Sequence, residues 1–206
     1  MGTKGIILAP RLPALLALDY ASGLIGGPSG RRRPQCSPGG VREGGVVAGH
    51  LVEPFAVQSG EGVELKTPTD DVVTVKAATG QTNGSLSVLE FAVSPKNGPA
   101  LHTHLREDEL WYVLEGDFRF KAGDAMFRVS AGGLAFGPRG MPHAFQNIGD
   151  TPGRLLVITT PSGLERFFEE FAALLPGPAS PETLTAVGHA NWVEFVGPPV
   201  GVTDPL

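Results

Sequence analysis

Four side chains of the kinds that bind metal ions form a pattern along the chain. His102, His104 and Glu109 lie close together, and His143 follows later, although only five histidines occur among the 206 residues. Residues i and i+2 of a β-strand point to the same side of a sheet, so a strand here would direct both His102 and His104 into one space. Two histidines alone would also fit an ordinary strand surface. The full set of four predicts a metal site.

Glu109 can join the two histidines if the chain reverses after them. Residues 105–108 are mostly polar, as expected for a reversal, and residues 110–114 are typical of a returning strand. Antiparallel pairing would then bring the carboxylate back beside the imidazoles. We therefore expect three ligands to come from one β-hairpin. The alternative for Glu109 is a solvated carboxylate in the acidic run 107–109.

His143 follows a predicted turn. Pro138 fixes φ and Gly140 permits a left-handed backbone, so the chain is expected to turn sharply before a strand begins near His143. This arrangement would bring the fourth ligand to the start of a strand.

Together these segments resemble the two signature motifs of the cupin superfamily. The first motif, H-x-H-x4-E-x6-G, is matched from His102 to Gly116, and the second, G-x5-P-x-G-x2-H-x3-N, is matched from Gly132 to Asn147. Lys96 stands where the family usually has a glycine before the first histidine. This departure concerns the turn that enters the strand and none of the ligands.

The resemblance implies one divalent transition metal held by His102, His104, Glu109 and His143. Iron, manganese, nickel, cobalt, copper and zinc all accept such ligands, so the sequence leaves the identity of the metal open. Three imidazoles and one carboxylate would leave one or two positions for water, substrate or dioxygen.

The fold class follows from many short apolar runs separated by Gly, Asn, Asp and Pro, which predict an all-β protein. The resemblance, over about Leu86 to Ile158, implies a single cupin jelly-roll β-barrel. We expect the barrel over residues 51–160, and C-terminal helices and a tail packed on it over residues 161–206. The candidate strands are 72–76, 87–93, 111–114, 117–121, 125–129, 134–136, 143–146 and 154–159.

A substrate pocket is predicted beside the ligands. By strand alternation Trp111 shares a face with Glu109, and Phe145 and Asn147 share a face with His143. We take Trp111, Phe136, Phe145 and Asn147 as the pocket residues. For Trp111 and Phe145, ordinary barrel core is an equal alternative.

A helix is predicted after the barrel. Ser162 and Glu165 have the spacing of a capping box, and apolar residues then recur at helical spacing. Its phenylalanines are more typical of a face packed on the domain than of a ligand-binding stripe. A second short helix is predicted to begin at Ser180-Pro181-Glu182.

The N-terminal segment differs in composition. Residues 21–45 contain Gly or Pro at 11 of 25 positions, too many for a packed segment, so we expect residues 1–45 to be a disordered extension. The apolar run 5–18 is interrupted by Pro10, Arg11 and Pro13 and makes a poor secretion signal. An extension without a folded role is favoured over secretion, and we expect a cytoplasmic protein.

Charge and cysteine content exclude several function classes. Residues 51–206 carry 10 basic and 19 acidic side chains, a net charge of −9, which argues against nucleic-acid binding. Cys36 is the single cysteine, so an intrachain disulfide and a thiolate metal site in the barrel are excluded. No apolar run approaches the roughly 20 residues needed to span a bilayer.

The whole pattern resembles small cupins described as quercetin 2,3-dioxygenase-like. That resemblance implies a dioxygenase that acts on a flavonol-like or other hydroxy-ketone, with dioxygen as co-substrate and Glu109 as both ligand and catalytic base. One alternative is a small-molecule-binding or regulatory cupin with a structural metal, and another is a redox-neutral isomerase or decarboxylase. The resemblance also suggests a homodimer, with the C-terminal aromatic residues available to cover an edge.

Overall fold

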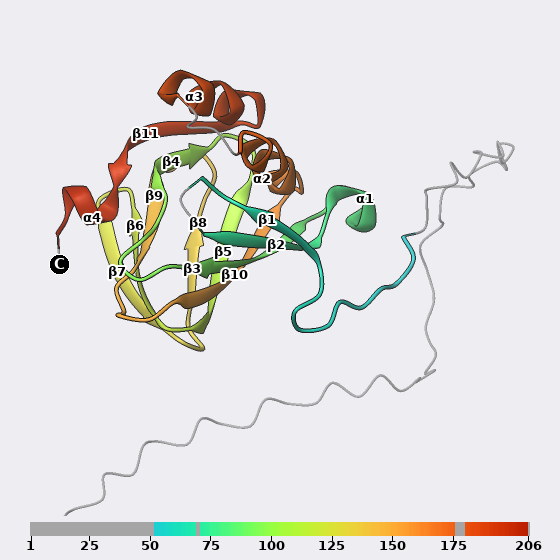
Figure 1. Ribbon diagram of the computed structural model, residues 1–206, viewed down its shortest axis with the longest axis horizontal. Coiled ribbons are helices and arrows are strands. Elements are labelled where there is room, and N and C mark those ends of the chain that lie inside the picture. Colours follow the sequence, from blue (N-terminus) through green and yellow to red (C-terminus); the bar gives the residue numbers. More distant parts are fainter. Residues whose placement is uncertain (1–51, 69–70, 176–179, 206) are drawn as a thin grey trace, which may run out of the picture. The chain divides into compact units, whose positions relative to one another are not determined.

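The computed structural model describes residues 52–68, 71–175 and 180–205. Its strands are β1 Val63–Lys66, β2 Val72–Ala77, β3 Ser87–Val93, β4 Ala100–His104, β5 Asp108–Glu115, β6 Asp117–Ala122, β7 Ala125–Ser130, β8 Leu134–Gly137, β9 His143–Asn147, β10 Gly153–Thr160 and β11 Val193–Pro199. They form two facing antiparallel sheets with the orders β1-β2-β3-β10-β5-β8 and β11-β4-β9-β6-β7 (Figure 1). The predicted all-β jelly roll is confirmed, and each of the eight candidate strands is present.

Strand alternation decides which side chains enter the space between the sheets. In β6, Phe118 and Phe120 are buried, whereas Arg119 and Lys121 lie partly exposed on the other face. The same period in β5, β3 and β10 supplies the rest of the core. Its other buried members include Leu89, Trp111, Val113, Leu155 and Val157.

The predicted hairpin around the first two histidines is wrong. β4 pairs with β11 and β9 in one sheet, whereas β5 pairs with β10 and β8 in the other. Residues 105–107 therefore carry the chain from one sheet across to the facing one. Glu109 reaches the two histidines from the opposite wall of the barrel, not from a neighbouring strand.

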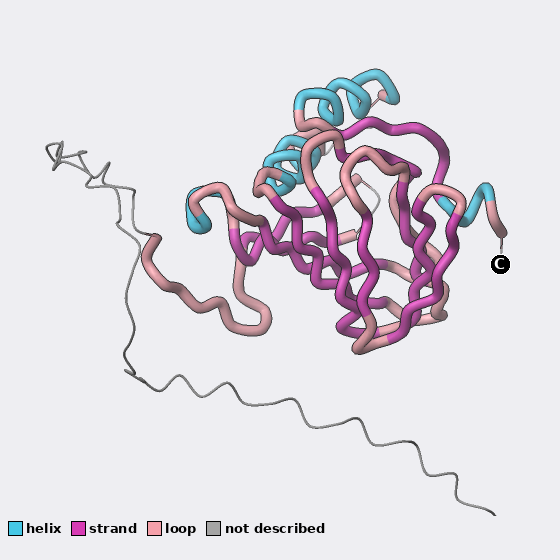
Figure 2. Tube along the Cα trace, turned by 180° about the vertical axis from the view of Figure 1, so that it is seen from behind, coloured by secondary structure: helices cyan, strands magenta, loops and turns pink. Residues whose placement is uncertain are grey.

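Two helices lie side by side at one end of the barrel (Figures 1 and 2). They are α2 Leu164–Ala172 and α3 Pro181–Ala190, and two short helices, α1 Thr79–Thr82 and α4 Val200–Thr203, lie elsewhere on the domain. The predicted start of α3 is confirmed, because Ser180 Oγ accepts a hydrogen bond from the backbone of Thr183. The C-terminal segment also contributes a strand that was not predicted, since β11 joins the sheet beside β4.

The predicted capping box at Ser162 and Glu165 is not formed. Gly163 is the N-cap of α2 and makes no side-chain cap. The Glu165 carboxylate instead accepts hydrogen bonds from Ser87 Oγ and from both the backbone and the hydroxyl of Thr79. Burial alone would raise the pKa of Glu165, but these hydrogen bonds hold it below its usual value. The carboxylate thereby ties α2 to β3 and α1.

Replacing Glu165 with alanine is expected to destabilise the domain by about 3 kcal/mol near pH 7, because a hydrogen bond to a charged group contributes roughly 1.5–3 kcal/mol and several donors lose their acceptor. The lowered pKa means that this stability is present above the unfolded value of 4.5 and is lost as the pH falls through the folded value. Urea unfolding at two pH values measures both effects. Glu169→Ala, on the exposed face of the same helix, is the control and should change stability little.

The turn before β4 has a left-handed residue at Lys96, the position where the sequence departs from the cupin motif. Lys96 adopts a φ of 62°, the left-handed region that favours glycine. Its ammonium group donates to the carbonyl of Ile148 at 2.7 Å and pairs with Asp150 at 2.9 Å. The lysine thus adopts a backbone conformation that glycine favours, and its side chain contacts the loop after β9.

Two further expectations concern the N-terminal segment and membrane-spanning helices. The predicted disordered extension, residues 1–45, lies outside the described residues. Of the helices that are described, none is long and apolar enough to cross a membrane.

Candidate metal centre

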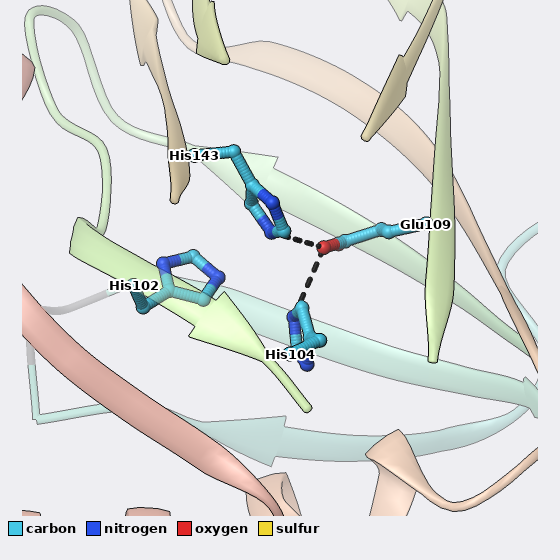
Figure 3. Close-up of side chains that lie close together, drawn as sticks. All are labelled: His102, His104, Glu109 and His143. Carbon is cyan, nitrogen blue, oxygen red and sulfur yellow. Dashed lines mark hydrogen bonds and ion pairs between the residues drawn. The ribbon is translucent and has the colours of Figure 1, made fainter. Parts of the chain in front are cut away.

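Four potential ligands converge between the sheets (Figure 3). His102 and His104 come from β4, Glu109 from β5 and His143 from β9, and one ligand atom from each lies within 4.8 Å of the others. His102 is directly opposite His143 in the β4–β9 pairing, with their ring centroids 4.8 Å apart. The side chains of His104, Glu109 and His143 are almost fully buried. This arrangement can hold a metal ion.

The hydrogen bonds of the imidazoles fit a bound cation. Nδ1–H of His102 donates to the carbonyl of Ala100 at 2.8 Å, and Nδ1–H of His143 donates to the carbonyl of Met141 at 2.9 Å. A carbonyl can only accept, so the proton of each neutral ring stays on Nδ1 and the Nε2 lone pair is free. Nε2 of His143 faces Glu109 Oε2 at 3.1 Å. A nitrogen lone pair and a carboxylate oxygen repel each other unless a cation lies between them, as it does in metal sites.

The electrostatics of the group also indicate a cation site. Burial, together with the nearby His104 and His143, lowers the pKa of His102 to about 3. Burial alone would raise the pKa of Glu109, but the neighbouring His104 and His143, His104 foremost, hold it well below its usual range. Burial would lower the pKa of His104, yet the Glu109 carboxylate at 3.0 Å raises it. Without an ion, a proton on His104 takes its place beside Glu109.

The affinity for zinc is therefore expected to rise with pH. A raised pKa means that His104 keeps its proton above pH 6.5, and this proton must leave before Nε2 can bind an ion. Below the raised pKa, the release of one proton corresponds to about a tenfold gain in affinity per pH unit. Calorimetric titration in buffers of different ionisation enthalpy would count the released protons. An affinity that does not change between about pH 6 and pH 8 would contradict this assignment.

A cavity of about 340 Å³ opens onto the metal site. His102, His104 and Glu109 themselves form part of its wall. The remaining wall is mostly apolar and includes residues of β3, β9, α2, α3 and β11. Its aromatic members are Phe91, Phe145, Phe167, Phe168, Phe171 and Phe195. The phenylalanines of α2 thus pack on the core, as the sequence favoured, and they also line a cavity.

The family model of the cupin domain matches residues 89–159. Residues 89–159 are therefore similar to a cupin domain. An uncharacterized protein of Methanocaldococcus jannaschii, MJ1618, is 31% identical over 75 residues, which make up 36% of this chain. The aligned part spans 60% of the length of that relative.

Solved structures of similar proteins have also been found. TT1209 from Thermus thermophilus is 31% identical, with a TM-score of 0.37 over 38% of this chain and 74% of its own. A predicted oxalate decarboxylase from Thermotoga maritima is 20% identical, with a TM-score of 0.49 over 52% of this chain and 99% of its own. The part of the cavity wall that α2, α3 and β11 form lies outside residues 89–159, which the family model matches.

The four predicted pocket residues have different surroundings in the structure. Phe145 lines the cavity. Trp111 is buried in the core, where its ring contacts those of His143 and Phe120. The amide of Asn147 is buried and donates to the carbonyls of Val93 and Thr151, so it holds loops together.

Phe136 lies away from the cavity, and its side chain is 50% exposed. The inward positions of β8 are taken by Ala135 and Gly137, which pair with Trp111 and Glu109 of β5. A Cβ added at Gly137 would lie 2.6 Å from the Trp111 ring. The indole therefore leaves no room for a large inward side chain on β8, and Phe136 is placed on the outer face.

Glu107 is a buried residue near the site that was not singled out from the sequence. Glu107 belongs to the mostly polar segment 105–108, yet it is only 2% exposed, and burial raises the pKa of its carboxyl group. A signal was present, because Glu107 continues the alternation of buried residues through Glu109, Trp111 and Val113 by one step upstream.

Proposed function

We propose that this chain is a mononuclear metal-dependent dioxygenase that acts on a flavonol-like molecule or another hydroxy-ketone. The observation that carries the proposal is that His102, His104 and Glu109 line the 340 Å³ cavity themselves. Structural metal sites are closed by their protein ligands, whereas catalytic sites keep an open position. A cavity of this size is within the range of small-molecule sites.

The cavity wall suits an aromatic substrate and oxygen chemistry. Phenylalanines on α2, β9 and β11 can contact a ring system, and they keep bulk water away from the reacting groups. Among the described residues that line the cavity, no lysine or arginine is present. This composition favours an uncharged ring system over a phosphate or a dicarboxylate.

The residues of the chain have separate roles in this proposal. A divalent transition metal, held by the three histidines and Glu109, would supply open positions for the substrate oxygens and for dioxygen. Glu109 meets His104 and His143 through Oε2. Its Oε1 takes part in neither contact and can accept the proton of the substrate hydroxyl group. Phe145 and Phe195 would hold the ring beside these groups.

The test is oxygen consumption by the metal-loaded protein with a panel of flavonols and other hydroxy-ketones. Uptake in step with substrate loss, and a redox-active metal at one per chain in protein purified without a histidine tag, would support the proposal. Uptake no faster than with the free metal, or zinc alone at full occupancy, would overturn it in favour of a binding module or a redox-neutral enzyme.

The proposal includes a homodimer. Tyr112 and Leu134 are opposite each other on the outer face of β5 and β8, and with Phe136 they are 40%, 55% and 50% exposed. β8 is the last strand of its sheet, so a second copy could cover both this apolar face and the strand edge. The edge by β11 is a weaker candidate, because Phe195 lines the cavity instead. Light scattering would give the mass, and Leu134→Lys is expected to shift it toward the monomer.

A further inference from the structure

The three imidazoles of the metal centre differ in what holds their Nδ1 atoms. Those of His102 and His143 donate to backbone carbonyls, and this fixes each ring with Nε2 directed at the site. Nδ1 of His104 is buried as well, but it has no hydrogen-bond partner among the described residues. The structure therefore leaves one of the three rings without the contact that orients the other two.

A carboxylate oxygen faces that nitrogen. Glu107 Oε2 lies 4.0 Å from His104 Nδ1, and this oxygen is also buried with no hydrogen-bond partner among the described residues. A donor and an acceptor that both lack partners are thus opposite each other. A shift of about 1 Å would bring them to hydrogen-bond distance.

The other oxygen of Glu107 is held in place by its neighbour. Arg106 Nε lies 3.1 Å from Glu107 Oε1, and the same guanidinium group donates to the carbonyl of Ser162 at the entrance to α2. These contacts fix the carboxylate from its outer side, so that Oε2 points inward. Arg106 is itself 43% exposed, so its charge is partly solvated.

We propose that Glu107 is a positioning residue of the metal centre and accepts a hydrogen bond from His104 Nδ1–H when Nε2 of that ring binds an ion. The proposal rests on the metal site proposed above, but not on the reaction. In this role Glu107 orients the His104 ring, as the carbonyls of Ala100 and Met141 orient the rings of His102 and His143. A carboxylate acceptor also increases the basicity of Nε2 more than a carbonyl does, which strengthens the bond to the metal.

Three variants test this role through zinc affinity, measured by competition with a chelator. Glu107→Leu removes the acceptor and keeps most of the volume, and it is expected to weaken zinc binding by about 10- to 100-fold. Glu107→Gln keeps a carbonyl oxygen that can accept the hydrogen bond and is expected to lose less than Glu107→Leu. Asp108→Asn is the control, because Asp108 follows Glu107 directly, at the start of β5, but faces Arg139, and the zinc affinity of this variant should stay close to that of the wild type.

A second measurement separates positioning from a purely structural role. With only five histidines in the chain, long-range ¹H–¹⁵N spectra of the zinc-loaded protein can resolve each imidazole. A protected Nδ1–H signal of His104 is expected in the wild type and in Glu107→Gln, and its loss is expected in Glu107→Leu, whereas the signals of His102 and His143 should not change.

The outcomes that overturn the proposal are distinct. A Glu107→Leu variant that binds zinc as tightly as Asp108→Asn, or that keeps the protected His104 signal, would refute the positioning role alone. A lower melting temperature with unchanged zinc affinity would show that Glu107 serves only the fold. A wild-type protein without zinc affinity would refute the proposed metal site itself.

Discussion

Alanine at His102, His104 or His143 is expected to reduce metal affinity by more than the roughly 10- to 100-fold typical of losing a residue that supports a ligand. Each imidazole supplies one of four ligand atoms, and the remaining three cannot complete the site. The domain is expected to stay folded, because the hydrophobic core is formed by other side chains. Metal content by elemental analysis and circular dichroism would measure the two effects separately.

His189→Ala provides the control for these variants. His189 lies on the exposed face of α3 and belongs to neither motif, so its removal should leave metal content unchanged. Full occupancy in all three ligand variants would refute the site assignment. Loss of the fold along with the metal would instead indicate a structural ion.

The second large effect is expected in catalysis. Glu109→Gln should reduce oxygen consumption by about 100-fold or more, since a general base alone typically contributes 10²- to 10⁴-fold and the variant also weakens a ligand. Trp111→Phe should have a much smaller effect. The indole N–H is buried and has no hydrogen-bond partner among the described residues, so phenylalanine removes no hydrogen bond from the wall behind His143.

Initial rates at saturating substrate and matched metal content would test this difference. Because the metal content is matched, equal losses in the two variants would mean that Glu109 contributes no more to the rate than the packing of the cavity wall does. A Glu109→Gln variant that keeps both metal and full activity would show that another group takes the substrate proton.

Local spacing predicted much of this structure. The period of two located the buried residues of β5 and β6, and the motif spacing selected the four side chains that the fold brings together. The partner of each strand was harder to predict. Residues 105–107 are as short and polar as a hairpin turn, yet they cross between sheets. Nothing in the local sequence distinguishes these two geometries, because the difference depends on whether β11 and β9 occupy the edges of β4.

The cavity wall was harder to predict for the same reason. Phe136 is apolar and close to the second motif, but the Trp111 ring occupies the inward space opposite β8. Phe167 and Phe195 lie far from the motifs in sequence and reach the cavity through α2 and β11. Side chains that line a space between distant elements can be assigned only when the packing of those elements is known.

The position of β11 has a consequence for how the protein is made. β4 carries two of the four ligands, and one of its two neighbours is β11, which begins at Val193, about 90 residues after His104. At a translation rate of roughly 5–20 residues per second, β4 leaves the ribosome about 5–20 s before that neighbour does. Until then, the ligand strand has an open edge and the cavity lacks a wall. Metal uptake is therefore expected to follow synthesis of the C-terminal segment and not to accompany emergence of the motifs.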